Sequence, residues 1–380
     1  MTRVLLTARH RIDDIRSWSG SSWHIARELR QRFDVQVADS PTPRLDRIVH
    51  GSLGRRVPGM APIDLRRNRA TGWLTERAVR AQRVALRADA HVAIAAAQHL
   101  VADSGIPQIY VSDNVYALQA DVFERVHGPM PARARRRRLS LESSLLQRAD
   151  LLAVPSYAAA RAAVEAHGVR PERVVVAPFG ANLADLDPTP HVAGSHAGPL
   201  QLVFIGVSWQ HKGGPLLLDA MRILRSRGID YELHLVGAEP TGDHTLWHSH
   251  RRIDKTHPAG LLELAHLLDR ADLLVFPTRA DAYGVVVCEA AAFGVPTIAT
   301  RLEGTSTTIE HGVTGLLVDL ESGAEEWADA IATYADDRQA LQRASVGARH
   351  RYERLLNWQA WGDTVAATIR QVSGHVHEHQ

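Results

Sequence analysis

The stretch DLLVFPTRADAYGVVVCEAAAFGVPTIAT, residues 272–300, contains a complete strand, helix and strand. DLLVFP is a short apolar run that ends in a polar loop, GVVVCEAAAFG has helical length, and VPTIAT is again short and rich in β-branched residues. Strands that alternate with helices of this length indicate parallel sheets built from βαβ units. The stretch therefore predicts an α/β fold.

Two carboxylates, Asp281 and Glu289, stand at the ends of the apolar run VVVC in this stretch. Charged residues are almost never fully buried unless they are paired or used. Asp281 lies in the loop after a strand, where doubly wound sheets bind ligands, and Gly284 opens the next helix with its outward-pointing amides. Two interpretations stay open: the carboxylates contact a ligand, or Asp281 caps the helix and Glu289 pairs with an arginine.

The same alternation runs through the whole chain in two series. Strands are expected at 4–8, 92–96, 106–112, 151–155 and 173–178 in the first series, with helices at 21–33, 135–149 and 157–168. In the second series, strands are expected at 200–206, 231–237, 272–277 and 295–300, with helices at 213–228, 258–271 and 284–294.

Composition shifts divide the chain into two domains. We expect an N-terminal Rossmann-like domain over 1–185, a Pro- and Gly-rich linker over 186–199, and a C-terminal Rossmann-like domain over 200–358. A last helix, at about 359–375, is expected to pack back on the first domain. Two doubly wound domains of this kind bind ligands where the carboxyl ends of their strands face each other across a cleft.

Length and composition fit a soluble protein with two cores. The chain has 380 residues, no apolar run near the roughly 18 residues of a membrane span, and no visible secretory signal. The single cysteine, Cys288, rules out an internal disulfide and a zinc-type cluster. A cytoplasmic enzyme or binding protein is the expectation.

Charge is distributed unevenly along the chain. Residues 1–190 hold 28 Arg and Lys against 19 Asp and Glu, whereas residues 191–380 hold 16 against 23. The run RARRRR at 133–138 could meet an anionic membrane surface or a charged acceptor, or could be a solvated helix face. It has no interleaved aromatic residues and belongs to no recognised nucleic-acid-binding module, so nucleic acid is not an expected partner.

Lysine is almost absent: among 44 basic residues only Lys212 and Lys255 are lysines. Lys212 lies in FIGVSWQHKGG, after a strand that ends at Gly206 and a loop that contains Trp209. Glycine and lysine at the start of a helix hold phosphate through backbone amides and one compact positive charge. The spacing is not that of a P-loop.

A second candidate anion site lies in the first domain. In SWSGSS, residues 17–22, Gly20 and Ser21 open a helix after the first strand and its loop. No GxGxxG follows that strand, which argues against a dehydrogenase.

These segments together resemble the GT-B glycosyltransferases, and specifically the retaining, nucleotide-sugar-dependent enzymes of family 4. The resemblance covers most of the chain in the expected order. It is carried by SWSGSS (17–22), VAPFGANL (176–183), FIGVSWQHKGG (204–214), IDKTHP (253–258), PTRADAYGVVVCEAAAFGVPTIAT (277–300) and TTIEHGVTGLLVDL (307–320).

The resemblance implies a role for each matching residue. Asp281 would bind hydroxyls of the donor sugar, Glu289 the two ribose hydroxyls, and Lys212 the diphosphate as it leaves. Backbone amides around Tyr283, Gly284 and Val285 would receive that diphosphate, with Gly20 beneath it. The implied donor-binding set is Gly20, Gly206, Trp209, Lys212, Lys255, Asp281, Tyr283, Gly284, Val285 and Glu289, and the implied catalytic set is Lys212, Asp281 and Asp113.

The chain departs from the family pattern at three positions. Asp281 is one methylene shorter than the family's glutamate, Val207 stands where many relatives have arginine, and Glu303 replaces the first glycine of a Gly-Gly pair. Asp113, in YVSDNVY, lies in the general region of an acceptor-side polar group, or it simply caps a helix.

The implied reaction is transfer of a hexose-type sugar from a nucleotide diphosphate to an acceptor hydroxyl, with retention of configuration. No cofactor or metal is expected, UDP is the favoured nucleotide, and the departing phosphate would deprotonate the acceptor. The one Asp-x-Asp match, DLD at 185–187, is interpreted as linker. The alternative is a catalytically silent GT-B protein that binds nucleotide sugar as a sensor or scaffold.

Overall fold

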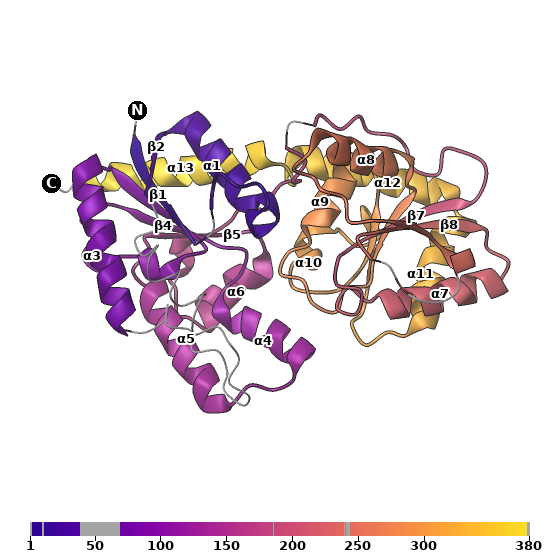
Figure 1. The fold of residues 1–380 in the computed structure, drawn as a ribbon, viewed down its shortest axis with the longest axis horizontal. Coiled ribbons are helices and arrows are strands. Elements are labelled where there is room, and N and C mark those ends of the chain that lie inside the picture. The colour runs from indigo at the N-terminus through magenta and orange to yellow at the C-terminus, as the bar shows by residue number, and fades with distance from the viewer. Residues whose placement is uncertain are drawn as a thin grey trace.

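A computed structural model describes residues 2–9, 11–38, 69–184, 186–238, 240 and 244–377. It consists of two α/β lobes side by side (Figure 1), each built on a six-stranded sheet in which all pairings are parallel. The predicted fold class, two Rossmann-like domains, is confirmed.

In the first domain the strand order is β2-β1-β3-β4-β5-β6. The strands are β1 (Arg3–Ala8), β2 (Asp34–Val37), β3 (Ala90–Ile94), β4 (Gln108–Val111), β5 (Leu151–Val154) and β6 (Val174–Val176). The helices are α1 (Ser21–Arg32), α3 (Arg69–Leu86), α4 (Tyr116–His127), α5 (Ala132–Leu146) and α6 (Tyr157–Glu165). The order reverses between β1 and β3, which is where such a sheet opens a ligand crevice at its carboxyl edge.

In the second domain the order is β12-β11-β10-β7-β8-β9, and it reverses between β7 and β10. The strands are β7 (Leu200–Ile205), β8 (Tyr231–Val236), β9 (His248–His250), β10 (Leu273–Phe276), β11 (Thr297–Thr300) and β12 (Gly315–Val318). The helices are α7 (Gly214–Ser226), α8 (Pro258–Arg270), α9 (Val285–Ala292), α10 (Thr305–Thr308), α11 (Ala324–Asp336) and α12 (Arg338–Arg354).

The central strands explain why short apolar runs were visible in the sequence. Every residue of β3, β4, β5, β10 and β11 is buried, because helices cover both faces of a parallel sheet. The sequence pattern is therefore a continuous apolar run and not an alternation.

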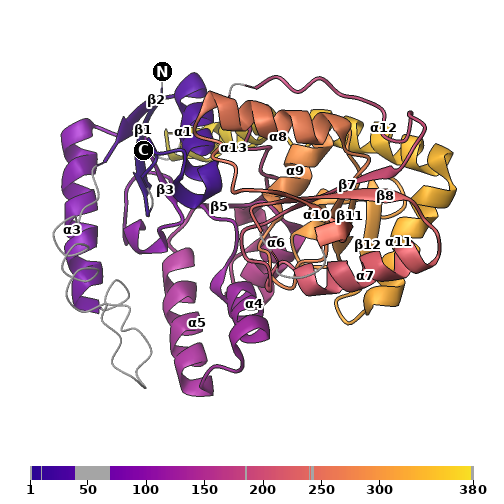
Figure 2. The same cartoon turned by 45° about the vertical axis from the view of Figure 1, so that its right-hand side comes forward.

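The chain crosses between the domains twice. The first crossing follows β6, and the second leads from α12 into α13 (Trp358–His377), which runs back along the first lobe against α1 (Figures 1 and 2). Arg32 of α1 pairs with Asp363 of α13 at 2.7 Å. The two crossings touch at Gly180, where a Cβ would lie 2.3 Å from the backbone nitrogen of Trp358. Only glycine leaves room for this contact.

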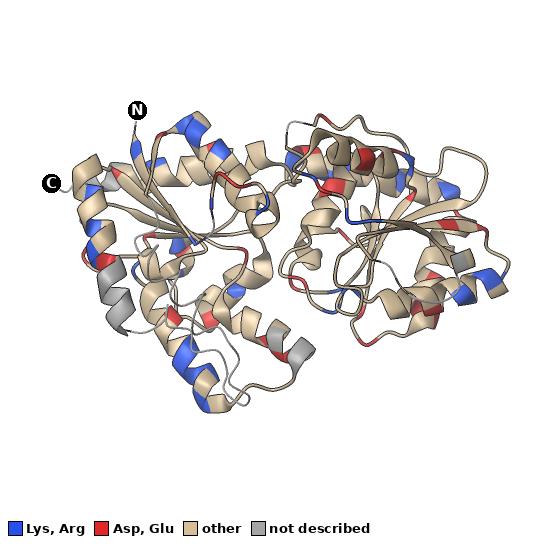
Figure 3. Cartoon of the chain, viewed as in Figure 1, with Lys and Arg blue, Asp and Glu red and all other residues tan. Residues whose placement is uncertain are grey.

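The basic run lies on α5, which projects with α4 from the first lobe (Figure 3). Arg135 is paired with Asp121 and with Glu124 of α4, the latter at 3.0 Å. Among the helices within the described ranges, none combines the length and apolar character that crossing a bilayer would require.

Candidate active site

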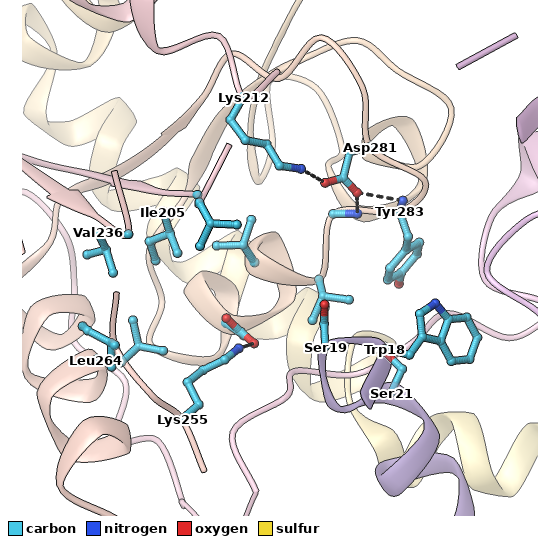
Figure 4. A pocket seen from close by; sticks show the side chains of 18 of the residues that line it. Trp18, Ser19, Ser21, Ile205, Lys212, Val236, Lys255, Leu264, Asp281 and Tyr283 are labelled. Atoms are coloured by element: carbon cyan, nitrogen blue, oxygen red, sulfur yellow. Dashed lines mark hydrogen bonds and ion pairs between the residues drawn. The ribbon is translucent and has the colours of Figure 1, made fainter. Parts of the chain in front are cut away.

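A cavity of about 710 Å³ lies between the two domains. It opens at the carboxyl ends of β7, β8 and β10, which is the reversal point of the second sheet, and it faces the turn before α1 and Asp113 after β4. Two ion pairs stand in it (Figure 4), and each uses one of the two lysines of the chain. Both domains therefore contribute to one site.

The first ion pair joins Lys212 and Asp281, with 2.5 Å between Nζ and Oδ2. Lys212 comes from the loop before α7, and its ammonium also lies 5.1 Å from the centre of the Phe276 ring. Side-chain exposure is 21% for Lys212 and 19% for Asp281, so both groups remain open to the cavity. A ligand phosphate that enters would find a positive charge already in place.

Asp281 also closes the loop before α9. Its Oδ1 accepts hydrogen bonds from the backbone nitrogens of Tyr283 at 3.0 Å and Gly284 at 2.6 Å. Gly284 has a left-handed φ of 87° and precedes the helix, whose first residue is Val285. Two of the amides that were expected to receive a diphosphate are thus taken by this carboxylate. Neither hydrogen bond reaches an amide inside α9, so the helix-capping interpretation of Asp281 is wrong: the carboxylate closes the loop before the helix and also lines the cavity.

The second ion pair joins Lys255 and Glu289, with 2.5 Å between Nζ and Oε1. Glu289 is only 2% exposed, whereas a third of the Lys255 side chain is accessible. The carboxylate lies on α9 and lines the cavity. The ion-pair partner of Glu289 is therefore a lysine and not the arginine considered above. Glu289 is both paired and part of the cavity wall, so the two interpretations do not exclude each other.

Glycines make room for the lysine loop. A Cβ on Gly206 would lie 2.9 Å from Cγ of Lys212, so the missing side chain leaves space for the lysine stem. At Gly213, φ is +75° and a Cβ would lie 1.9 Å from the carbonyl oxygen of Pro277. The loop that holds Lys212 therefore packs directly on the loop that leads to Asp281.

Trp209, a predicted donor-binding residue, packs on the core of the second domain, and its contact with the donor stays a prediction. Trp209 does not line the cavity; its ring meets Phe204 edge to face at 5.5 Å, and a Cβ on Gly214 would lie 2.2 Å from that ring. The indole packs against the apolar core of the second domain and supports the Lys212 loop from behind. A large apolar ring in a loop gains more from this burial than from exposure in a wet cleft.

The first domain supplies the opposite wall. Trp18, Ser19 and Ser21 line the cavity, and Gly20 between them is buried with a φ of 96°. The indole Nε1 of Trp18 donates to Oδ2 of Asp113 at 3.1 Å. Burial and the nearby Asp281 carboxylate raise the pKa of Asp113 above its usual range.

Tyr283 lies at the boundary between the domains. Its hydroxyl donates to the carbonyl oxygen of Phe179 at 3.0 Å. Burial raises the pKa of Tyr283 well above its ordinary value. The side chain is thus a fixed structural donor and carries no proton chemistry at neutral pH.

Several lining residues were missed by the sequence analysis. The far end of the cavity is apolar, and its wall comes from β7, β8 and α8 through Ile205, Val236 and Leu264. Arg252 and Ile253 line it from the loop after β9. These side chains resemble ordinary core or loop residues in the sequence, and only the fold shows that they meet. Of the departures, Val207 lines the cavity, while Glu303 is not among its lining residues.

Comparisons with known proteins identify the family of the chain. Residues 21–185 match the family model described as Glycosyltransferase Family 4, and residues 199–337 match the one described as Glycosyl transferases group 1. The D-inositol 3-phosphate glycosyltransferase of Pseudarthrobacter chlorophenolicus is 29% identical over 289 residues, which cover 72% of this chain and 67% of that protein. The enzyme of the same name from Paenarthrobacter aurescens is 30% identical over 291 residues, covering 71% and 68%.

Solved structures show the same fold. Sucrose-phosphate synthase from Thermosynechococcus elongatus has a TM-score of 0.67 at 18% identity and covers 99% of this chain and 100% of its own. Anabaena HepE in complex with UDP and glucose has a TM-score of 0.64 at 18% identity and covers 98% and 100%. The fold and the two family models define a GT-B glycosyltransferase. The chain belongs to glycosyltransferase family 4.

Proposed function

We propose that this enzyme moves a hexose-type sugar from a nucleotide diphosphate to a hydroxyl of an acceptor, with retention of configuration and without a metal. The observation that supports this most directly is the pair of lysine–carboxylate contacts in the interdomain cavity, Lys212–Asp281 and Lys255–Glu289. Carboxylates accept from sugar hydroxyls, and ammonium groups neutralise phosphates. The cavity contains both kinds of group.

The lining of the cavity supports one orientation of the donor. Glu289 takes the ribose hydroxyls near the apolar end, Lys212 takes the diphosphate, and the sugar lies toward Asp281 and Asp113. A UDP-linked donor is the first choice, because the HepE structures are described as complexes with UDP, with UDP and glucose and with UDP-glucose. The apolar wall at Ile205 and Val236 then faces the base.

In the proposed step, the bond from the anomeric carbon to the phosphate oxygen breaks and a bond to the acceptor oxygen forms on the same face. The departing phosphate takes the acceptor's proton. Lys212 contributes most when negative charge builds on that phosphate, because an interaction stronger in the transition state than in the ground state raises turnover. Asp113 orients the acceptor hydroxyl from the first domain.

The acceptor is a hydroxyl compound that enters between the domains. Inositol 3-phosphate belongs in the acceptor panel because relatives at about 30% identity carry its name. Glycans and lipid-linked sugars complete that panel. We place the reaction in the cytoplasm, with the exposed arginines of α5 directed at the inner face of the membrane.

A thermal-shift panel of UDP, GDP and ADP tests the donor. A matching nucleotide at 100 times its dissociation constant adds about 2.7 kcal/mol of stability. The matching nucleotide sugar is then incubated with the acceptor panel, with and without EDTA, and released nucleotide diphosphate is measured. Release that EDTA leaves unchanged is the expected result.

Other outcomes contradict parts of the proposal. A strict need for a divalent cation would overturn the lysine-based mechanism. Binding without release in any condition would favour a silent sensor. If none of the three nucleotides stabilises the protein, the donor assignment fails.

A further inference from the structure

The turn before α1 has an unusual backbone. Three consecutive residues lie in the left-handed region, with φ of 49° at Trp18, 56° at Ser19 and 96° at Gly20. Glycine adopts this conformation freely, but residues with a side chain do so at a cost and persist there only when their surroundings hold them. Strain of this kind is concentrated at functional sites.

Groups from the two domain crossings hold the turn. The side-chain amide of Asn182 donates to the carbonyl oxygen of Ser19 at 2.6 Å. Asn182 in turn accepts from the indole nitrogen of Trp358, at the start of α13, at 3.0 Å. The Phe179 ring meets Trp18 edge to face at 5.8 Å. The turn is thus fixed from outside its own loop.

This conformation brings the Trp18 indole to Asp113. Its Nε1 donates to Oδ2 at 3.1 Å, across 95 positions of sequence, and both residues line the cavity. Two other charged groups act on Asp113: Asp281 from the second domain and Arg9 from the end of β1. Of the contacts to the carboxylate, the indole bond is the one that the strained turn provides.

We propose that Trp18 is a positioning residue, which fixes the Asp113 carboxylate so that it meets the acceptor hydroxyl in a single orientation. This rests on the proposed function, in which Asp113 lies on the acceptor side. Trp18 touches neither reacting atom; it acts through Asp113. On this assignment, the strained backbone and the hydrogen bond from Asn182 serve to direct the indole N–H of Trp18 at the Asp113 carboxylate.

The pH dependence of turnover follows from the same contact. Burial and Asp281 raise the pKa of Asp113, while the Trp18 hydrogen bond and Arg9 lower it. Asp113 acts as a carboxylate, so activity is lost as pH falls through its pKa. Removing the indole N–H raises that pKa further, and the acid limb of the kcat profile must move to higher pH.

Trp18→Phe is the test, because phenylalanine keeps a ring against Phe179 and removes the donor. We expect kcat to fall about tenfold, as for the loss of one hydrogen bond to a charged group, with the KM for the nucleotide sugar within about twofold. The acid limb should rise by up to about one pH unit. Trp23→Phe is the matched control: Trp23 packs on His24 and Arg27 in α1, away from the cavity, and should change neither quantity.

A double-mutant cycle with Asp113→Asn makes the assignment specific. If Trp18 acts through Asp113, adding Trp18→Phe to Asp113→Asn causes no further loss. Losses that multiply, or an unmoved acid limb in a folded Trp18→Phe enzyme, would overturn the assignment. Should Trp18→Phe not fold, Asn182→Ala, which removes the support of Ser19, must give the same limb shift. If the wild-type enzyme transfers no sugar, the proposed function and this assignment fail together. If the wild type is active but Trp18→Phe leaves the acid limb where it was, only this assignment fails.

Discussion

Asp281 holds three donors with one carboxylate. One oxygen accepts from Lys212, and the other accepts from the amides of Tyr283 and Gly284. Aspartate side chains often accept hydrogen bonds from backbone amides two and three residues further along the chain, because the side chain is short enough to reach them. The missing methylene thus has a physical consequence: the carboxylate sits in the place where a phosphate would find two amides and an ammonium.

Asp281→Asn separates the hydrogen bonds that close the loop from the negative charge. The amide oxygen of asparagine still accepts from the two backbone amides, but the ion pair with Lys212 is lost. Without that competitor, a bare nucleotide diphosphate should bind about tenfold more tightly, since a charge-assisted hydrogen bond is worth about 1.5–3 kcal/mol and a factor of ten about 1.4 kcal/mol. Turnover of the full donor should fall, because the proposed contact between this carboxylate and the donor sugar is weakened.

Calorimetry with the matching nucleotide diphosphate measures this effect. Asp319→Asn, which alters an exposed ion pair with Arg301 in the same domain, is the matched control and should bind like the wild type. An Asp281→Asn enzyme with unchanged or weaker affinity would show that the carboxylate does not compete with phosphate.

At the scale of elements, α5 carries charge that the fold leaves unused. Arg135 is paired with α4, but Arg133, Arg136 and Arg137 are exposed and make no ion pair with other described residues. Each arginine near an anionic lipid surface contributes about 1 kcal/mol. Changing all three to glutamine should therefore weaken binding to phosphatidylserine vesicles on the order of a hundredfold, measured by co-sedimentation at low salt.

The control for α5 is a triple change of the same kind in the second domain, which should leave vesicle binding unaltered. Suitable exposed positions are Arg222, Arg225 and Arg343. Equal loss for both triple variants would mean that net charge, and not this helix, drives the association. No binding by the wild type would make the run a solvated helix face.

The central strands and the edge strand β6 were predictable from sequence, whereas the edge strands β2, β9 and β12 were not. Strands β5 and β10 were predictable from the apolar runs LLAVP and DLLVFP, because a strand that is buried on both faces has apolar side chains throughout. β9 consists of His248, Ser249 and His250, which carry no apolar signal, and it exists because its backbone pairs with β8. The edge strands β2 and β12 and the helices α3 and α4 were likewise missed.

The candidate site likewise contains residues that could be predicted from sequence and residues that could not. Lys212 and Glu289 stood out because a scarce lysine and a buried carboxylate need a reason. The left-handed turn at Trp18 could not be predicted from the sequence SWSG, because Asn182 and Phe179, from a distant segment, hold its conformation. The packing of Trp209 against Phe204 depends on tertiary contacts in the same way.

At the scale of the molecule, the site exists only where the domains meet. Tyr283 of the second domain donates to Phe179 in the first crossing, and Phe179 stacks on Trp358 in the second at 5.3 Å. A further contact joins the backbone nitrogen of Tyr157 to Thr307 at 3.2 Å. An aromatic cluster therefore joins the second domain to both crossings beside the shared cavity.

Stability of the first domain should depend on pH through two buried histidines. His91 is 0% exposed and His167 is 2% exposed, and His167 Nε2 accepts from the backbone nitrogen of Ala117 at 3.2 Å, which a protonated ring cannot do. Burial lowers the pKa of His91 to about 3 and that of His167 to about 4. In the unfolded chain both titrate near the ordinary value of about 6.5.

Because the folded pKa values are depressed, the unfolded state binds more protons below pH 6.5, and stability falls as pH falls from there toward the folded values. Each histidine should remove about 1.4 kcal/mol per pH unit, or about 2 kcal/mol by pH 5. Urea unfolding at pH 7.5, 6.5 and 5.0 measures the loss. In His167→Gln the side-chain oxygen still accepts from Ala117 but does not titrate. The loss of unfolding free energy per pH unit below pH 6.5 should therefore be smaller by about 1.4 kcal/mol, the contribution of one histidine. His266→Gln, at an exposed position of α8, should keep the wild-type slope. A His167→Gln protein as acid-sensitive as the wild type would show that this imidazole is not kept neutral by the fold.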